Sequence, residues 1–391
     1  MEPLLPGATI GVLGSGQLGR MLAFAAHRMG YRIAVYSPGS DTPAGGAADL
    51  EMDAQYEDED ALARFAGVVD VVTVEFENIP SSALELLERS VPVRPGPAAL
   101  HITQNRRREK EFLARHGLPH ARAIHLNDPA ELDRALAAIG TPAVLKTAGF
   151  GYDGKGQLMI AGNDDRAAAA AQAEAGPCVL EEFVEFEREV SVLVARTPDG
   201  EMATCGPIEN RHAKHVLDLS TVPARLATDA AQEARDLARD VAVSLELVGL
   251  ACVEMFVTAG GGLLVNEIAP RPHNSGHLTI EACVASQFEQ QLRSVCGLPL
   301  AGMEFVRPAA MANLLGDLWH DGEPDWTAAL RIPGVALHLY GKERARPGRK
   351  MGHITALADT PEAAARRALE ARAALGAANS LGSGGLASPR T

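Results

Sequence analysis

The sequence has little of what marks several classes of protein. Its 391 residues include five cysteines, none in a CxxC spacing, so we expect neither a disulfide framework nor a cysteine zinc site. It has no run of about 18 apolar residues and no basic segment at its start, so we expect neither a membrane span nor a signal peptide. Acidic residues outnumber basic ones by 50 to 36, so the formal net charge is -14. This net charge disfavours nucleic acid as a partner. These absences predict a cytoplasmic protein with reduced thiols.

The length and the order of patterns predict more than one domain, since 391 residues suffice for two or three domains of about 150 residues. Early in the chain, apolar strands alternate with helical patterns, which predicts a parallel α/β sheet. The expected strands are 8–13, 32–36 and 68–74, with a helix at 20–29. The remainder predicts an α+β arrangement, with a charged helix from 103, strands at 142–146, 158–160, 177–183, 190–195 and 202–206, and a helix at 229–245. Later we expect strands at 309–314 and 335–339, a basic loop over 340–353 and a helix at 361–375.

A GxGxxG pattern lies between the first strand and the first helix, at Gly14, Gly16 and Gly19. This is the context of a dinucleotide site. Such a site also needs an acid after the second strand to hold the ribose, and here Ser37 and Pro38 occupy that place. The pattern therefore leaves open a tight packing turn, or a site for some other phosphate.

A second glycine-rich turn follows the strand that ends at Lys146, with the sequence GFGYDGKGQ. Exposed backbone N–H groups beside a lysine commonly bind phosphate, although the spacing is not that of the Walker A motif. The acidic segment Glu181–Glu182–Phe183–Val184 and then Glu189 come next, where an acid could hold ribose hydroxyls. The alternatives are a hairpin tip and a solvated turn.

The segment CVEMFVTAGGGLLVNEIAPRPHNSGH, residues 252–277, predicts a hairpin of two apolar strands. Folding it about the bond between Gly260 and Gly261 places Glu254 opposite Glu267. Carboxylates directly opposed on paired strands repel each other. A divalent cation would turn that repulsion into attraction, and carboxylates together with phosphates are how Mg²⁺ is commonly held. The alternatives are two exposed acids, or one carboxyl with a raised pKa.

Two basic clusters stand out in an acidic chain. The first, Arg271, His273 and Asn274, follows the hairpin on a loop stiffened by prolines. The second lies in YGKERARPGRKMGH, which contains Lys342, Arg346, Arg349 and Lys350. Arginine forks suit a phosphate or carboxylate, so the clusters predict an anion pocket, whereas surface solubility is the alternative.

Taken in order, these segments resemble the ATP-grasp superfamily, and within it the ribonucleotide ligases of purine biosynthesis. The resemblance runs through ATIGVLGSGQLGRML, EFENIP, VLKTAGFGYDGKGQ, EEFVEFEREVSV, ENRH, VEMFV, NEIAPRPHNSGH and YGKERARPGRKMGH. It implies an α/β fold, α+β in the grasp part. The expected parts are a Rossmann-like pre-ATP-grasp domain at 1–102, an ATP-grasp domain at 103–300 with its lid at about 115–183, a small C-terminal domain at 301–378 and a flexible tail at 379–391.

The resemblance also assigns residues to sites. Those implied around ATP are Arg106, Lys146, Gly151, Tyr152, Asp153, Gly154, Lys155, Gly156, Gln157, Glu181, Glu182, Phe183, Val184, Glu189, His212, Asn266 and Glu267. The implied ligands of Mg²⁺ or Mn²⁺ are Glu254 and Glu267. Those implied around the ribonucleotide are Gly16, Gln17, Leu18, Glu75, Asn78, Arg271, His273, Asn274, Lys342, Arg349 and Lys350. Those implied nearest the chemistry are Tyr152, Asp153, Lys155 and Arg271.

The implied activity is the carboxylation of 5-aminoimidazole ribonucleotide with ATP and bicarbonate, through carboxyphosphate. The implied assembly is a homodimer that passes its product to a mutase. Many relatives carry Asn two residues after the second acid, where this chain has Ala269, so water or Asn266 would complete the metal's ligands. The alternatives are a formate-dependent glycinamide ribonucleotide transformylase, an NAD(P)-dependent oxidoreductase and a nucleotide-sensing protein without turnover.

Overall fold

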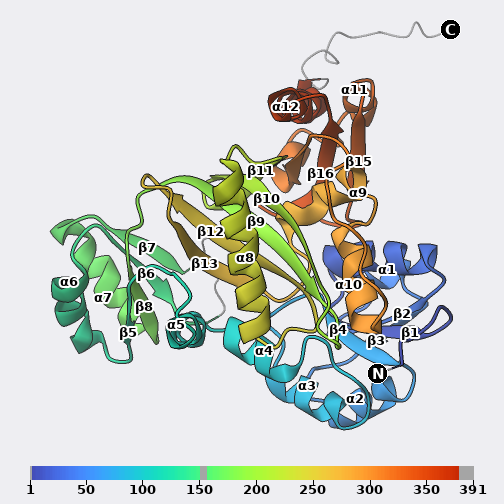
Figure 1. The fold of residues 1–391 in the computed structure, drawn as a ribbon, viewed down its shortest axis with the longest axis horizontal. Coiled ribbons are helices and arrows are strands. Elements are labelled where there is room, and N and C mark those ends of the chain that lie inside the picture. The colour runs from blue at the N-terminus through green and yellow to red at the C-terminus, as the bar shows by residue number, and fades with distance from the viewer. Residues whose placement is uncertain (1, 150–155, 378–391) are drawn as a thin grey trace, which may run out of the picture.

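The computed structural model describes residues 2–149 and 156–377, which form three sheets with helices packed on them (Figure 1). The first sheet is parallel, in the order β3-β2-β1-β4, and confirms the expected α/β unit. Its elements are β1 (Thr9–Leu13), α1 (Gln17–Arg28), β2 (Arg32–Ser37), β3 (Leu50–Asp53), α2 (Glu59–Ala66), β4 (Val71–Val74), α3 (Ser81–Glu88) and α4 (Pro97–Thr103). Helix α1 covers one face and α2 with α3 the other, which is why β1 and β2 are almost wholly apolar.

The predicted charged helix begins three residues later than expected, at Arg106. Helix α4 ends at Thr103, and α5 (Arg106–Arg115) starts anew, because the Asn105 side chain accepts hydrogen bonds from the backbone N–H groups of Arg107 and Arg108. This N-cap fixes the first turn of α5. It thereby fixes which side chains of the helix are buried.

The second sheet is antiparallel, in the order β5-β8-β6-β7, and two helices cover one of its faces. Its elements are β5 (Ala123–Leu126), α6 (Leu132–Ile139), β6 (Ala143–Thr147), β7 (Gln157–Ile160), α7 (Arg166–Glu174) and β8 (Cys178–Glu182). Leu136 of α6 and Ala169 of α7 pack with Leu145 and Leu180 of the strands. The other face is therefore free to line a site.

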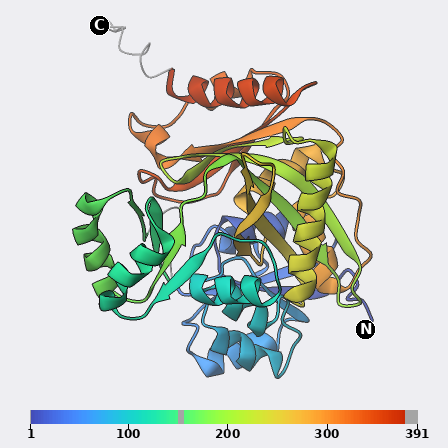
Figure 2. The same cartoon turned by 60° about the vertical axis from the view of Figure 1, so that its left-hand side comes forward.

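The third sheet has eight strands, in the order β13-β12-β9-β10-β11-β14-β16-β15. The strands are β9 (Phe186–Arg196), β10 (Met202–Ala213), β11 (Val216–Val222), β12 (Gly249–Thr258), β13 (Leu263–Ala269), β14 (Ala309–Leu315), β15 (Val335–Leu339) and β16 (Lys350–Leu357). The helices after β11 are α8 (Thr228–Ser244), α9 (Thr279–Ala282), α10 (Gln287–Cys296), α11 (Trp326–Leu330) and α12 (Pro361–Ala377). Helix α8 covers the strands around β12, and α12 covers the C-terminal strands (Figure 2). The expected antiparallel pairing of β9 with β10 is confirmed.

One prediction about the C-terminal region is wrong. The segment 340–353 was expected to be a loop, but β16 begins at Lys350 and pairs with both β14 and β15. Gly352 interrupts the apolar pattern from which a strand would be predicted. The fold needs a glycine at this position, because a Cβ would lie 2.5 Å from the carbonyl oxygen of His338. The C-terminal strands thus continue the central sheet.

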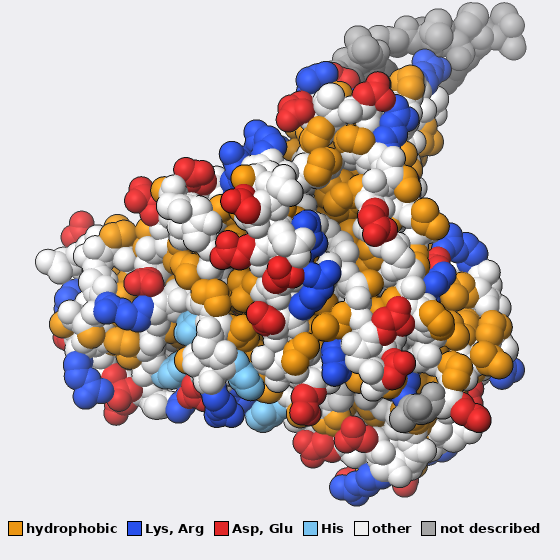
Figure 3. All heavy atoms as spheres, in the orientation of Figure 1, with side chains coloured by type: hydrophobic (Ala, Val, Ile, Leu, Met, Phe, Trp, Pro, Cys, Tyr) orange, Lys and Arg blue, Asp and Glu red, His pale blue; other side chains and the backbone are white. Residues whose placement is uncertain are grey.

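Among the described residues, no helix is long and apolar enough to cross a bilayer. On the face drawn in Figure 3, acidic and basic side chains are interspersed, so the net negative charge does not form one continuous patch there. The predicted tail, 379–391, lies outside the described residues.

Candidate active site

The two acids of the hairpin face each other as predicted. Glu254 of β12 pairs with Glu267 of β13, and the register then shifts between Glu254 and Met255. Burial raises the pKa of Glu267, and the charge of Glu254 raises it further. Burial also disfavours the charged form of Glu254, but His273 outweighs it and lowers the pKa of that carboxyl. The pair therefore concentrates negative charge on Glu254.

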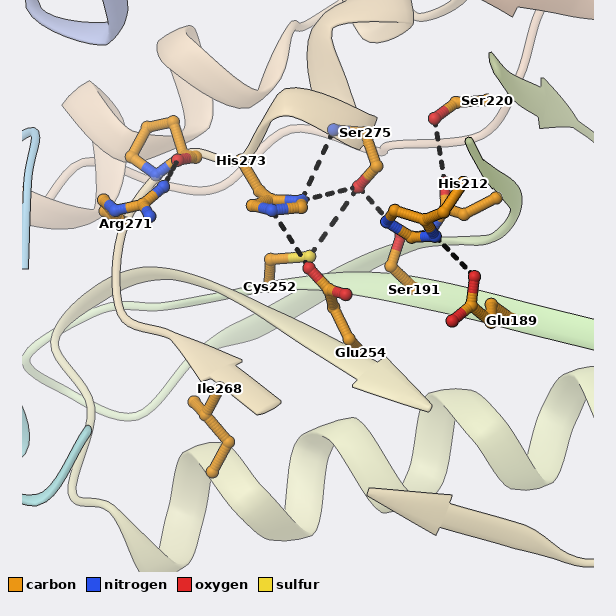
Figure 4. A network of polar contacts seen from close by, with 12 residues as sticks. Glu189, Ser191, His212, Ser220, Cys252, Glu254, Ile268, Arg271, His273 and Ser275 are labelled. Atoms are coloured by element: carbon orange, nitrogen blue, oxygen red, sulfur yellow. Dashed lines mark hydrogen bonds and ion pairs between the residues drawn. The ribbon is translucent and has the colours of Figure 1, made fainter. Parts of the chain in front are cut away.

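His273 is the direct partner of Glu254. Its Nε2 lies 3.0 Å from Glu254 Oε1, and its Nδ1 lies 2.9 Å from Ser275 Oγ (Figure 4). Burial lowers the pKa of His273, but the neighbouring Cys252 and Glu254 raise it to about 10. The sequence assigned His273 to the ribonucleotide. The structure brings it to the acid pair, where one oxygen of Glu254 is held and the carboxylate is oriented.

A chain of buried polar groups continues behind Ser275. Its hydroxyl lies 2.8 Å from Ser191 Oγ, the Asn210 amide donates to Ser191 Oγ at 2.9 Å, and the Ser220 hydroxyl donates to Asn210 Oδ1 at 2.8 Å. Ser191, Ser220 and Ser275 are fully buried. Residues of strands β9, β10 and β11 thus support His273 through Ser275 (Figure 4).

Helix α5 completes the free edge of β13. Glu109 Oε1 accepts the backbone N–H of Ile268 at 2.7 Å, and Lys110 Nζ donates to the Asn266 carbonyl at 2.9 Å. These two bonds flank Glu267 and satisfy edge groups that would otherwise lack a partner strand. Neither side chain was predicted from the sequence to belong to the site. Their spacing from the apolar Phe112 and Leu113 was the available signal that they lie on the buried face of α5.

Two lysines surround one buried carboxylate. Lys146 Nζ lies 2.8 Å from Glu181 Oε2, and Lys110 Nζ lies 3.8 Å from Glu181 Oε1. Burial raises the pKa of Glu181, but Lys110 and Lys146 together hold it below its usual value. Arg106 joins the cluster by donating to the Thr147 carbonyl at 3.0 Å. These three cations outnumber the single carboxylate of Glu181. The excess positive charge lies where the sheet β5-β8-β6-β7 approaches Glu254 and Glu267.

Lys146 and the acidic segment were both predicted to lie at ATP, and Lys146 is ion-paired with Glu181 of that segment. The remaining members of the segment differ in exposure. Glu182 accepts the backbone N–H of Arg122 at 2.8 Å, and Phe183 is 40 % exposed. Val184 is half-buried. Glu189 is hydrogen-bonded to Nδ1 of His212.

The backbone N–H groups of the GxGxxG turn are hydrogen-bonded to a side chain of the protein. Buried Glu75, just after β4, accepts the backbone N–H of Gly16 at 2.8 Å and that of Gly19 at 3.1 Å. In a dinucleotide-binding domain the pyrophosphate occupies this helix N-terminus. Because the Glu75 carboxylate occupies it here, the turn, including Gln17 and Leu18 at the start of α1, is not arranged for NAD.

Residues of both basic segments act to lower the pKa of the same acids. Burial raises the pKa of Glu75, while Arg271 and Lys342 act to lower it. Lys350 likewise lowers the pKa of Glu254. The structure therefore brings together charges that are far apart in the sequence.

Individual contacts fix these basic groups. Arg271 Nε is hydrogen-bonded to Glu77, an acid that was not predicted from the sequence although it stands beside Asn78 in EFENIP. Lys342 Nζ donates to the Lys350 carbonyl at 2.6 Å, and Arg349 donates to the Arg344 carbonyl at 2.7 Å.

Asn274 stands apart, because both ends of its buried amide have no hydrogen-bond partner among the described residues. Most buried polar side-chain atoms have a hydrogen-bond partner, so both ends of this amide are available to a ligand.

Part of the predicted site cannot be placed. Gly151, Tyr152, Asp153, Gly154 and Lys155 lie outside the described residues. At the end of that loop the Gly156 carbonyl accepts the backbone N–H of Thr147 at 2.8 Å, and Gln157 begins β7.

Comparison with known proteins covers almost the whole chain. A model described as the ribonucleotide synthetase preATP-grasp domain matches residues 7–104, the ATP-grasp domain matches 111–288, and the phosphoribosylaminoimidazole carboxylase C-terminal domain matches 309–367. The N5-carboxyaminoimidazole ribonucleotide synthase of Bacillus subtilis (strain 168) is 46% identical over 352 residues, which are 90% of this chain and 92% of the relative.

Solved structures agree. The Staphylococcus aureus N5-carboxyaminoimidazole synthetase complexed with ADP is 36% identical with a TM-score of 0.89, over 95% of this chain and 99% of that one. The Aspergillus clavatus synthase in complex with ADP and 5-aminoimidazole ribonucleotide is 33% identical with a TM-score of 0.88, over 95% and 99%. The chain therefore belongs to the N5-carboxyaminoimidazole ribonucleotide synthase family of ATP-grasp ligases.

Proposed function

We propose that the protein carboxylates 5-aminoimidazole ribonucleotide at its amino group, with ATP and bicarbonate, in purine biosynthesis. Bicarbonate attacks the γ-phosphate of ATP, which gives ADP and carboxyphosphate. Carboxyphosphate releases CO₂ and phosphate, and the amine of the ribonucleotide takes up the CO₂. The observation that carries the proposal is the junction of the buried cationic cluster with the opposed acids, in a chain whose close relatives share that activity.

The cationic cluster binds the ATP phosphates in this proposal. Lys146, Lys110 and Arg106 are held by Glu181 and by backbone carbonyls, so they are oriented before the nucleotide arrives. Such pre-orientation is the main protein contribution to phosphoryl transfer. The adenosine lies toward Glu182, Phe183 and Val184 at the end of β8.

The opposed carboxylates suit Mg²⁺ or Mn²⁺. Hard divalent cations prefer oxygen ligands, and the paired register of Glu254 and Glu267 places two carboxylates on adjacent strands. His273 holds one oxygen of Glu254 and leaves the other available. A bound ion would neutralise charge on the phosphate oxygens of ATP. Asn266 or water completes the ligand set, because Ala269 offers no side-chain donor.

The ribonucleotide lies between the two basic segments. Arg271, Lys342, Arg349 and Lys350 face its phosphate, and the unpartnered amide of Asn274 provides a donor and an acceptor for it. Tyr152, Asp153 and Lys155, which lie outside the described residues, remain the residues that we propose act nearest the reacting atoms.

Release of ADP tests the function. The assay uses Mg-ATP and bicarbonate, with and without 5-aminoimidazole ribonucleotide, and we expect release that needs both bicarbonate and the ribonucleotide. Turnover with formate and glycinamide ribonucleotide instead would assign the protein to the transformylase. The absence of ADP under every condition would favour a sensor. The oxidoreductase reading is disfavoured by the Glu75 carboxylate at the glycine turn.

We also propose that the protein is a cytoplasmic homodimer and that a mutase consumes its product. All five cysteines are buried and unbridged, which suits a reducing compartment. Sedimentation analysis at micromolar concentration tests the dimer, and a monomer would contradict it.

A further inference from the structure

Three donors of different chemistry converge beside the acid pair. Cys252 and Glu254 lie two residues apart on β12, so their side chains point to the same face of the sheet. His273 reaches that face from the loop after β13 (Figure 4). One ligand atom from each residue, namely the Cys252 sulfur, a Glu254 oxygen and a His273 ring nitrogen, lies within 4.8 Å of the other two.

This donor set differs from that of a magnesium site. Thiolate and imidazole favour Zn²⁺ and similar thiophilic cations, whereas Mg²⁺ requires oxygen ligands. Ligands around tetrahedral zinc lie about 3.5 Å apart, given bonds of about 2.0–2.3 Å, so a small convergence of the three side chains suffices. His273 is already oriented, because its Nδ1 contacts Ser275 Oγ at 2.9 Å and its Nε2 faces Glu254 at 3.0 Å.

The cluster is accessible although its thiol is buried. The side chains of Glu254 and His273 are 20% and 17% exposed, so an ion in solvent can reach two of the three donors. Cys252 Sγ lies 3.8 Å from Ser275 Oγ, which is a long and weak hydrogen-bond contact, and it also lies beside His273.

We propose that Cys252, Glu254 and His273 form a site for a thiophilic divalent cation of the Zn²⁺ class, which inhibits the enzyme. Binding releases to solvent the thiol proton of Cys252 and any proton on the bonded ring nitrogen. A fourth position is left to water. Because Glu254 cannot serve both cations, the thiophilic ion excludes Mg²⁺ from the acid pair. This last step rests on the proposed function, whereas binding itself does not.

Cobalt tests the binding directly. Co²⁺ is added to the metal-free full chain without nucleotide, and absorbance is followed in the near ultraviolet, where cobalt bound to thiolate has a charge-transfer band. We expect the band in the wild type and in Cys296→Ala, a matched change of another buried cysteine in α10, and no band in Cys252→Ala. Cys252→Ser, which keeps the side-chain volume, is measured in parallel and should also lack the band. No band in the wild type, or a band that persists in Cys252→Ala and Cys252→Ser, would overturn the site.

Inhibition tests the consequence. Cys252 is a ligand of neither substrate nor Mg²⁺ in the proposed function, and the activity of Cys252→Ala at each Zn²⁺ concentration is expressed relative to its own Mg²⁺-dependent release of ADP without Zn²⁺. The Zn²⁺ concentration for half inhibition should rise at least about tenfold in that variant and stay unchanged in Cys296→Ala. Equal sensitivity of the wild type and Cys252→Ala would refute inhibition through this cluster. The cobalt titration needs neither ATP nor ribonucleotide, so failure of the proposed function would leave its result interpretable.

Discussion

Glu267→Gln should stabilise the metal-free protein while it abolishes turnover. Two carboxylates about 5 Å apart, at an effective dielectric constant of about 20, repel each other by about 3 kcal/mol when both are charged. Burial, and then Glu254, raise the pKa of Glu267, so the folded state retains the proton longer than the unfolded state. The folded state therefore loses stability as the pH rises above the ordinary glutamate pKa, and glutamine removes that loss.

The size of the gain follows from these numbers. Because protonation of Glu267 relieves part of the repulsion in the wild type, we expect Glu267→Gln to raise the free energy of unfolding by about 1–3 kcal/mol at pH 8. At about 2–4 °C per kcal/mol for a domain of about 200 residues, this raises the melting temperature by several degrees. The assay is thermal unfolding in chelator at pH 8, followed by the same measurement with Mg-ATP. The wild type should be stabilised by Mg-ATP and the variant should not.

The matched control is Glu187→Gln, which neutralises an exposed acid on β9. It should change neither the melting temperature nor the release of ADP. If Glu267→Gln melted at or below the wild type in chelator, the repulsion argument would be refuted. Near-normal turnover of Glu267→Gln would refute the metal role.

Three further predictions concern the surroundings of the acids. Burial raises the pKa of Glu109 to about 8, so the stability of the wild type should fall between about pH 5 and 8. Glu109→Gln keeps an acceptor for the Ile268 N–H, and its melting temperature should fall less than that of the wild type across this pH range. Equal falls in the two proteins would contradict the raised pKa of Glu109. Ser191→Ala leaves two buried groups short of a partner, at a cost of about 1–3 kcal/mol, and should lower kcat with little change in the KM for ATP. Ser294→Ala, at an equally buried serine bonded only within α10, should leave kcat unchanged, and equal losses in both would argue against support of His273. Lys342→Ala should raise the KM for the ribonucleotide about tenfold and leave that for ATP nearly unchanged, whereas equal losses would indicate misfolding.

The acid pair was predictable because its geometry is local. Counting residues about Gly260 and Gly261 gives the pair Glu254 and Glu267, and the apolar flanks imply burial. Closer to the turn the strands pair one residue off that count, with Met255 opposite Val265, and the register shift after Glu254 restores the counted pairing at the acids. Glu254 and Glu267 consequently face each other as the sequence indicated. The parallel sheet of the first unit was equally accessible, because alternating strands and helices are also a local pattern.

Contacts between distant segments could not be predicted in this way. Glu109 and Lys110 stand in a run of charges that is typical of a solvated helix, and only the Asn105 cap and the packing of Phe112 turn them inward. The bond of Arg271 to Glu77 joins two loops that no periodicity relates. Strand β16 was missed because its position is set by pairing with β14 and β15.

The pairing of β11 with β14 has a consequence for the synthesis of the protein. Because β11 lies well before β14 in the chain, a ribosome releases it long before its partner exists. During that interval the nascent chain has an unpaired strand edge, which is a site for association with other chains. Gene fragments that end before β14 should therefore aggregate on expression, and strains with little chaperone capacity should yield less of the full-length protein.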